Sequence, residues 1–150
     1  MPHLIKAILS NRAVEIVARV VLTFPFWGSG LDKLINFGGG VAEMRQFGLE
    51  PAVAFNIATI LVQLGGSALV ISNRMTWLGA GALGVFTALT IPIVHRFWAM
   101  QGEASVHAFH TAAEHVGTIG GLVLVSILAA RRVQDRTTEG FPLPKVLLAR

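Results

Sequence analysis

The sequence predicts an all-α integral membrane protein, a bundle of four transmembrane helices. Hydrophobic residues make up 53% of the 150 residues and charged residues only 13%, whereas a soluble domain carries about a quarter charged residues. The apolar residues gather in four stretches of about 20 residues, the length that a helix needs to cross ~30 Å of hydrocarbon. We therefore expect one membrane domain over residues 1–150, with helices at about 13–34, 51–72, 76–95 and 111–130.

The first stretch differs from the others because Glu15 and Arg19 stand in its opening turns. We interpret it as a membrane helix and not as a cleaved signal, since its apolar run is long and no small-residue cleavage site follows it. The other three stretches carry almost no charge in their middles. Pro25 and Pro92 are expected to kink their helices, because proline lacks the backbone N–H. The polar residues 131–150 are predicted to be a mostly irregular tail.

Small residues are concentrated in the three later stretches, which predicts close packing between these helices. In lipid, small side chains let two backbones approach each other and gain dispersion contacts. The glycines concerned are Gly65, Gly66, Gly79, Gly81, Gly84, Gly117 and Gly121.

Lysine and arginine are divided unevenly between the two ends of the predicted bundle. Four spans place the N-terminus, the second connection and the C-terminus on one side of the membrane. That side carries Lys6, Arg12, Arg74, Arg131, Arg132, Arg136, Lys145 and Arg150, and the opposite side carries Lys33, Arg45 and Arg96. The positive-inside rule therefore predicts that both termini are cytoplasmic. Asp32 and Lys33 are predicted only to mark the water interface at the outer end of the first helix.

The composition also excludes several classes of function. The net charge of +4 does not indicate a nucleic-acid-binding protein, because the basic residues lie at the ends of apolar segments and form no patch. The sequence contains no cysteine. Thiol–disulfide exchange, Cys-ligated zinc and iron–sulfur clusters are therefore excluded, since each needs a thiolate. The expected partner is the lipid bilayer.

Glu15, Arg19 and Gln63 form the first candidate site. Glu15 and Arg19 are four residues apart, so they share a helix face with the acid on the N-terminal side. Arg19 lies about 10 Å into the span at 1.5 Å per residue, and a charge at that depth usually faces the bundle interior. Gln63 is expected at a similar depth on the second helix. The sequence favours a structural role, as a polar clasp or with Arg19 snorkelling to the interface, over a proton or substrate site.

Glu103, His107, His110 and Glu114 form the second candidate site, with spacings of four, three and four residues. If the fourth helix begins early, these side chains fall within about 60° of one face. Imidazoles and carboxylates are donors that bind Zn, Fe or Mn. The same group could instead move protons, and His95 at the end of the third helix could join it. The alternative is a water-exposed amphipathic lead-in to the fourth helix. The sequence favours this alternative because the spacing matches no fixed metal signature.

An ordered set of short motifs resembles the DoxX family of small membrane proteins. The motifs are Arg19, Gly30-x-x-Lys33-Leu34, Gly65-Gly66, Arg74, His95-x-Phe97-Trp98 and Gly120-Gly121. The set covers about residues 13–130, and its specificity lies in the order and spacing of the motifs. The chain departs from the family pattern at Gln63, where an acid is typical, and at His115, where Asn is frequent. We hypothesise that Glu15 takes over the role of the missing acid as the partner of Arg19.

The resemblance implies a fold and a class of activity. It implies a four-helix membrane bundle, and some DoxX members are associated with quinone-linked oxidoreductases, including a thiosulfate:quinone oxidoreductase. We therefore expect a subunit of such a system in the bacterial cytoplasmic membrane, with quinone as cofactor and a partner redox protein or a homo-oligomer around it. The candidate catalytic residues are Glu15, Arg19, Gln63 and His95. The alternatives are a non-catalytic scaffold or assembly factor and, third, a small-solute transporter.

Overall fold

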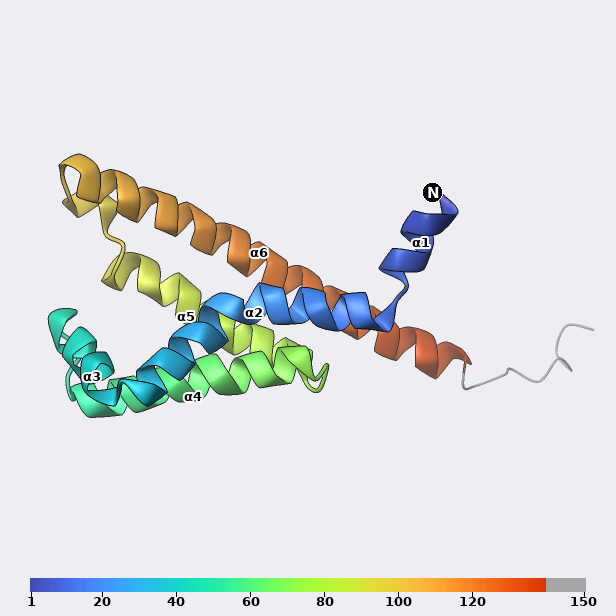
Figure 1. Cartoon of the computed structure of the whole chain (residues 1–150), viewed down its shortest axis with the longest axis horizontal. Helices are drawn as coiled ribbons and strands as arrows, with labels where there is room; N and C mark the ends of the chain where they lie inside the picture. Colours follow the sequence, from blue (N-terminus) through green and yellow to red (C-terminus); the bar gives the residue numbers. More distant parts are fainter. Residues whose placement is uncertain (140–150) are drawn as a thin grey trace, which may run out of the picture.

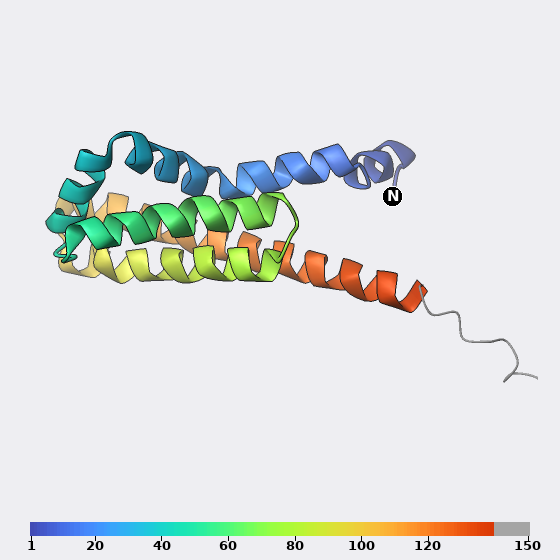
Figure 2. The same cartoon turned by 90° about the horizontal axis from the view of Figure 1, so that it is seen from below.

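The computed structural model describes residues 1–139, and the regular elements within them are all helices (Figure 1). They are α1 (His3–Leu9), α2 (Arg12–Ile35), α3 (Phe37–Gln46), α4 (Ala52–Ile71), α5 (Thr76–Ile93), the 3-10 helix η1 (Phe97–Ala99) and α6 (Gly102–Glu139). The start of α2, the α4–α5 connection and the last turns of α6 lie at one end of the bundle (Figure 2), here called the inner end. The opposite end, with α3 and η1, is called the outer end.

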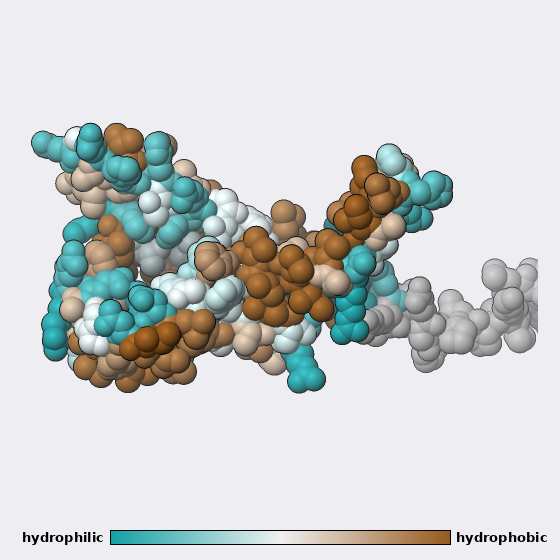
Figure 3. Space-filling model, viewed as in Figure 1, coloured by the Kyte–Doolittle hydropathy of each residue, from teal (hydrophilic) through white to brown (hydrophobic). Residues whose placement is uncertain are grey.

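Three or four membrane-spanning segments account for the bundle. The segments Ala52–Ile71, Thr76–Ala99 and Gly102–Asp135 are each long and apolar enough to cross a bilayer, and the two halves of α2 add a fourth if the bent pair is one broken span. Large apolar side chains such as Leu61, Val85 and Leu124 are exposed along these helices, and Figure 3 shows extensive apolar surface on the face it presents. Lipid would cover this surface, so the predicted all-α membrane bundle is confirmed.

The bend in α2 sets the shape of the outer half of the bundle. The segments Arg12–Leu22 and Phe24–Ile35 are inclined by 56° on either side of a position just before Pro25, which cannot donate a backbone hydrogen bond. Nearby carbonyls are capped by side chains: the Thr23 hydroxyl donates to the Arg19 carbonyl (2.8 Å) and the Trp27 indole to the Val20 carbonyl (3.1 Å). The outer half of α2 lies along α4 and away from α6 (Figure 1).

Three of the predicted packing glycines make close contacts between helices. A Cβ on Gly79 would lie 2.6 Å from the carbonyl oxygen of Gly66, and one on Gly66 would lie 2.8 Å from Leu83 Cγ. A Cβ on Gly121 would lie 2.8 Å from Leu22 Cδ1, so α6 touches α2 there. A Cβ on any of the remaining glycines of the predicted set would meet no neighbouring atom within 4 Å; these are Gly65, Gly81, Gly84 and Gly117. Of the predicted packing glycines, only Gly66, Gly79 and Gly121 therefore lie at close helix–helix contacts.

The last helix is longer than hydropathy predicted. It begins at Gly102 instead of 111 and continues to Glu139, so the prediction of an irregular tail is wrong for residues 131–139; the rest of the predicted tail lies outside the described residues. Its 38 residues measure about 57 Å at 1.5 Å per residue, and it extends past α5 at both ends (Figure 1). The extra turns are too polar for a hydropathy search, although they form a helix.

Helix α3 was not predicted at all. It lies in the connection between the first two spans, where Val41 and Met44 pack with Ala52 in a small separate core. The Asn36 side chain caps its start by accepting from the Gly39 backbone N–H (3.2 Å). Three consecutive glycines, residues 38–40, hide this helix from sequence inspection because glycine disfavours helices. The result is a short helix that covers the outer end of the bundle.

The glycine contact between α4 and α5 yields a stability prediction. Gly79→Ala is expected to lower the free energy of unfolding by about 1–3 kcal/mol, because the new Cβ would sit 2.6 Å from a backbone oxygen. Gly81→Ala is the matched control, since its Cβ meets no atom within 4 Å; alanine there should be neutral or mildly stabilising. Reversible unfolding in mixed micelles measures both, and equal stabilities for the two variants would contradict the assignment.

Candidate functional site

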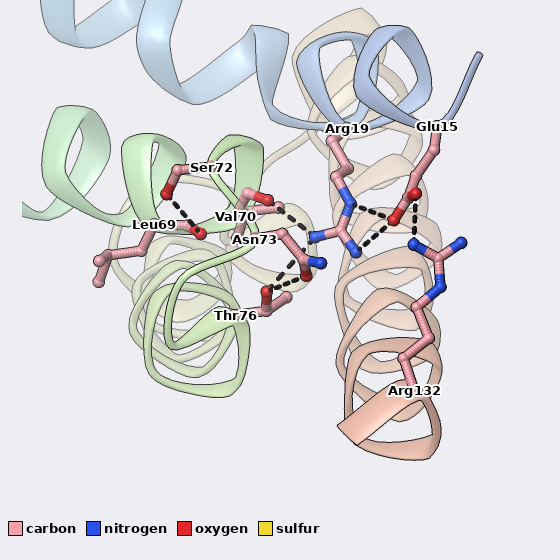
Figure 4. A network of polar contacts seen from close by, with 8 residues as sticks. All are labelled: Glu15, Arg19, Leu69, Val70, Ser72, Asn73, Thr76 and Arg132. Atoms are coloured by element: carbon pink, nitrogen blue, oxygen red, sulfur yellow. Dashed lines mark hydrogen bonds and ion pairs between the residues drawn. The ribbon is translucent and has the colours of Figure 1, made fainter. Parts of the chain in front are cut away.

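A buried polar network ties the helices together at the inner end (Figure 4). Its centre is Arg19 of α2, which is only 3% exposed. Arg19 Nη2 lies 3.0 Å from Glu15 Oε1, and Nη1 donates to the Val70 carbonyl oxygen (2.8 Å) and to Thr76 Oγ1 (3.3 Å). One guanidinium therefore joins α2 to the end of α4 and the start of α5. The predicted contact between Glu15 and Arg19 is present.

The end of α4 offers Arg19 a suitable acceptor. The last turn of a helix leaves backbone carbonyls without intrahelical donors, and its partial negative charge favours a cation. α4 ends at Ile71, so the Val70 carbonyl belongs to that turn. Thr76 extends the network to Asn73, because its hydroxyl donates to Asn73 Oδ1 (3.0 Å). The tight α4–α5 connection is thereby held against α2.

Glu15 also reaches the last helix. Its second carboxylate oxygen pairs with Arg132 Nη1 of α6 (Figure 4). The network therefore joins all four long helices of the bundle, α2, α4, α5 and α6. Sequence reasoning placed Arg132 only among the basic residues of a tail, because nothing local signals a contact between residues 117 positions apart.

Gln63 does not join this network. Its Nε2 donates to Ser29 Oγ of α2 (3.3 Å), and it precedes Val70 by seven residues, which is about 10 Å along α4. The expected depth was misjudged because α2 extends about two turns beyond the inner end of α4, so Arg19 is level with the last turn of α4. The predicted cluster thus reduces to Glu15 and Arg19, with Arg132 as its third member.

A cavity of about 510 Å³ lies in the outer half of the bundle. It exists because the outer half of α2 bends away from α6, and a hollow is visible between them in Figure 3. Its inner part is mainly apolar, with Phe26, Val62 and Phe86 beside the amide of Gln63. The outer part is polar and lined by Lys33, Glu43, His95, Glu114 and His115. The cavity therefore combines an apolar floor with an ionisable rim.

Lys33 is a buried member of this rim. It is 8% exposed, and its Nζ lies 2.6 Å from Glu43 Oε2 of α3. The prediction that Lys33 only marks the water interface is therefore wrong. Its partner belongs to α3, a helix that the sequence did not reveal, which explains why this ion pair was missed.

His95 lies against a histidine that the sequence singles out only as a departure from the family pattern. The rings of His95, just after α5, and His115, on α6, have centroids 5.0 Å apart and meet edge to face at 81°. Both rings line the cavity, as does Glu114. The third-helix histidine thus meets α6, as expected, but through His115 and not through His107 or His110.

The four predicted metal ligands are not brought together. Among residues 1–139 no three His, Cys, Asp or Glu side chains form a group that could hold a metal ion. α6 does begin early, so the four share a face, but Glu103 and Glu114 are about 16 Å apart along the helix axis. Glu103, His107 and His110 are exposed, and only Glu114 reaches the cavity. The geometry fits the water-exposed lead-in that was the alternative to a metal site.

The fold and the two sites define a class of protein: a small multi-pass helical membrane protein with an outer cavity and a buried polar network at the inner end. We call this network the inner clasp; its members are Glu15, Arg19, Val70, Thr76 and Arg132. Within that class the chain belongs to the DoxX family, whose model matches residues 15–96, more than half of the chain. The match includes Arg19, Lys33, Gln63 and His95 but not α6. No curated protein and no solved structure matches the chain.

The geometry of the clasp predicts the outcome of a rescue experiment. Glu15→Gln should lower the free energy of unfolding by about 3 kcal/mol, because it leaves the buried Arg19 guanidinium without its counter-charge. Adding Gln63→Glu should not restore stability, since position 63 faces Ser29 and not Arg19. Glu103→Gln, at an exposed position, is the matched control and should leave the free energy of unfolding unchanged. Recovery of stability in the double variant would show that Arg19 and position 63 do interact.

Proposed function

We propose that this DoxX protein is a membrane subunit of a quinone-linked oxidoreductase system and that its outer cavity binds the quinone ring. Family membership supports the general assignment, and the cavity is the observation that carries the location of the site. We place the protein in the bacterial cytoplasmic membrane with both termini cytoplasmic. Lys6, Arg12, Arg74 and Arg131 lie at the inner end, and the positive-inside rule assigns such an end to the cytoplasm.

The size and lining of the cavity suit a small ring compound. Its volume of about 510 Å³ falls within the roughly 300–1,000 Å³ typical of ligand pockets, which are mostly apolar with a few placed polar groups. A quinone ring needs hydrogen-bond donors for its carbonyl oxygens, and its reduced form needs acceptors for its hydroxyl groups. The lining residues provide both kinds of group.

Lys33 and Gln63 are the groups that would orient the ring. The Lys33 ammonium has three N–H donors, and the ion pair with Glu43 fixes its position. Gln63 is 5% exposed and lines the cavity, and its Oε1 has no hydrogen-bond partner among the described residues. An unpartnered buried amide oxygen is costly, so a small rotation that brings it to a ligand hydroxyl would be favourable.

His95 and His115 are the groups that would exchange protons. A bound quinone supplies two-electron, two-proton redox chemistry, and neutral imidazole both donates and accepts protons near neutral pH. Their rings lie at the outer rim, next to Glu114, so protons would pass to the outer solution. The electrons come from a partner redox protein in this proposal. Glu15 and Arg19, two of the catalytic candidates predicted from the sequence, are assigned to the inner clasp.

Quinone retention tests the proposal with a pair of neighbouring substitutions on α6. Protein extracted in native lipid discs should retain near-stoichiometric quinone by quantitative mass spectrometry. Thr118→Phe should weaken quinone binding by about tenfold, a loss of about 1.4 kcal/mol in binding free energy, and so lower the retained amount, because Thr118 lines the cavity. Gly117→Phe should retain it, since a Cβ at Gly117 meets open space. Wild-type quinone no higher than in an unrelated four-helix protein would refute the assignment.

A non-catalytic scaffold is the second candidate function. It is favoured by Gly65, Gly81 and Gly84, which have open space beside them on α4 and α5. Small residues on exposed helix faces are typical of helix–helix contacts in membranes. A membrane protein that co-purifies with the chain and is lost in Gly81→Phe, together with baseline quinone, would favour the scaffold.

A further inference from the structure

Helix α1 (His3–Leu9) is an amphipathic helix with no cover from the described part of the chain. It stands off the bundle at the inner end (Figure 1), and every one of its residues is exposed. Four large apolar side chains are exposed on it: Leu4 (73%), Ile5 (45%), Ile8 (47%) and Leu9 (65%). At 100° per residue these four span about 140° of the helix circumference, whereas Lys6 and Ser10 lie on the opposite side. Figure 3 shows the resulting apolar patch.

A helix this short needs a surface to remain folded. Helices below about 12–15 residues are marginal in water even with favourable sequences, and α1 has seven residues. No residue of α1 is buried by the described part of the chain. The stabilising contact for its apolar face must therefore come from outside that part.

The bilayer surface is the nearest candidate for this contact. Only Ser10 and Asn11 separate α1 from α2, and two extended residues reach about 7 Å. Asn11 fixes the start of the membrane helix, because its side chain accepts from the Ala13 backbone N–H (2.8 Å). α1 is thus tethered where α2 enters the membrane.

The charges at the inner end indicate the kind of lipid. Lys6 and Arg12 flank the tether, and Arg74 and Arg131 lie at the same end of the bundle and are exposed. Interfacial helices characteristically carry lysine or arginine on the polar face and insert the apolar face into the headgroup–acyl boundary. Anionic headgroups attract such basic residues, and each Lys or Arg near the surface raises the membrane-binding constant by about fivefold.

We propose that α1 is an interfacial anchor whose apolar face inserts into the anionic leaflet at the inner end. Leu4, Ile5, Ile8 and Leu9 enter the boundary region, and Lys6 points back to the headgroups. The anchor holds the first turns of α2, and with them Glu15, at a fixed depth. This inference is independent of the quinone proposal, because it concerns the other end of the molecule.

The absence of cysteine from the sequence makes a site-directed spin-label test straightforward. Ile8→Cys, in α1, and Ser10→Cys, at its C-cap, are a matched pair, since the two positions point to opposite sides of the helix axis. Each variant of the full chain carries one nitroxide in discs made with one-third phosphatidylglycerol. We expect the label at position 8 to be accessible to oxygen and protected from a water-soluble nickel chelate, and the label at position 10 to show the reverse.

Other outcomes would overturn the proposal in distinguishable ways. Both labels open to the nickel chelate would place α1 in water, and a label at position 8 protected from both reagents would indicate a protein partner. Lys6→Gln, or discs of phosphatidylcholine alone, should reduce the ratio of inserted to free α1, by about fivefold for the single charge. An unchanged ratio in both cases would refute the role of anionic lipid. None of these results bears on quinone retention.

Discussion

The buried guanidinium of Arg19 is the interaction on which the rest of the structure depends. A buried charge is tolerated only when it faces other polar groups, and the Glu15 carboxylate, the Val70 carbonyl and the Thr76 hydroxyl surround this one. Because these groups come from α2, α4 and α5, and Glu15 extends the contact to Arg132 of α6, satisfying one cation fixes the relative positions of four helices. The inner end is therefore closed.

This closure at one end leaves the other end free to diverge. Beyond the bend before Pro25, α2 follows α4 and leaves α6, and the space between them becomes the outer cavity. α3 completes the wall by bringing Glu43 to Lys33. Because packing and hydrogen bonds hold the helices together at the inner end, the outer end can stay open. The residues that stabilise the fold therefore lie at the inner end, and those available to a ligand lie at the outer end.

Features that depend on neighbours along the chain were accessible to sequence reasoning. Apolar stretches of membrane length revealed the long helices α2, α4, α5 and α6, and the four-residue spacing of Glu15 and Arg19 placed their side chains together because a helix repeats every 3.6 residues. The polar lead-in of α6 escaped a hydropathy criterion, and the glycines of α3 hid a helix stabilised by a small tertiary core. In both cases helix formation depended on something other than local apolarity.

The sequence by itself determined the membrane environment, the all-α class and the Glu15–Arg19 pair, because hydrophobic length and helical periodicity are local properties. Only the tertiary structure decided that Gln63 faces Ser29, that Lys33 is buried against Glu43, and that His95 meets His115. The His95–His115 contact depends on how the end of α5 packs against α6. The other two contacts depend on the axial offset between α2 and α4 and on the bend of α2. Both are set by how the helices pack, and no spacing within a single helix encodes them.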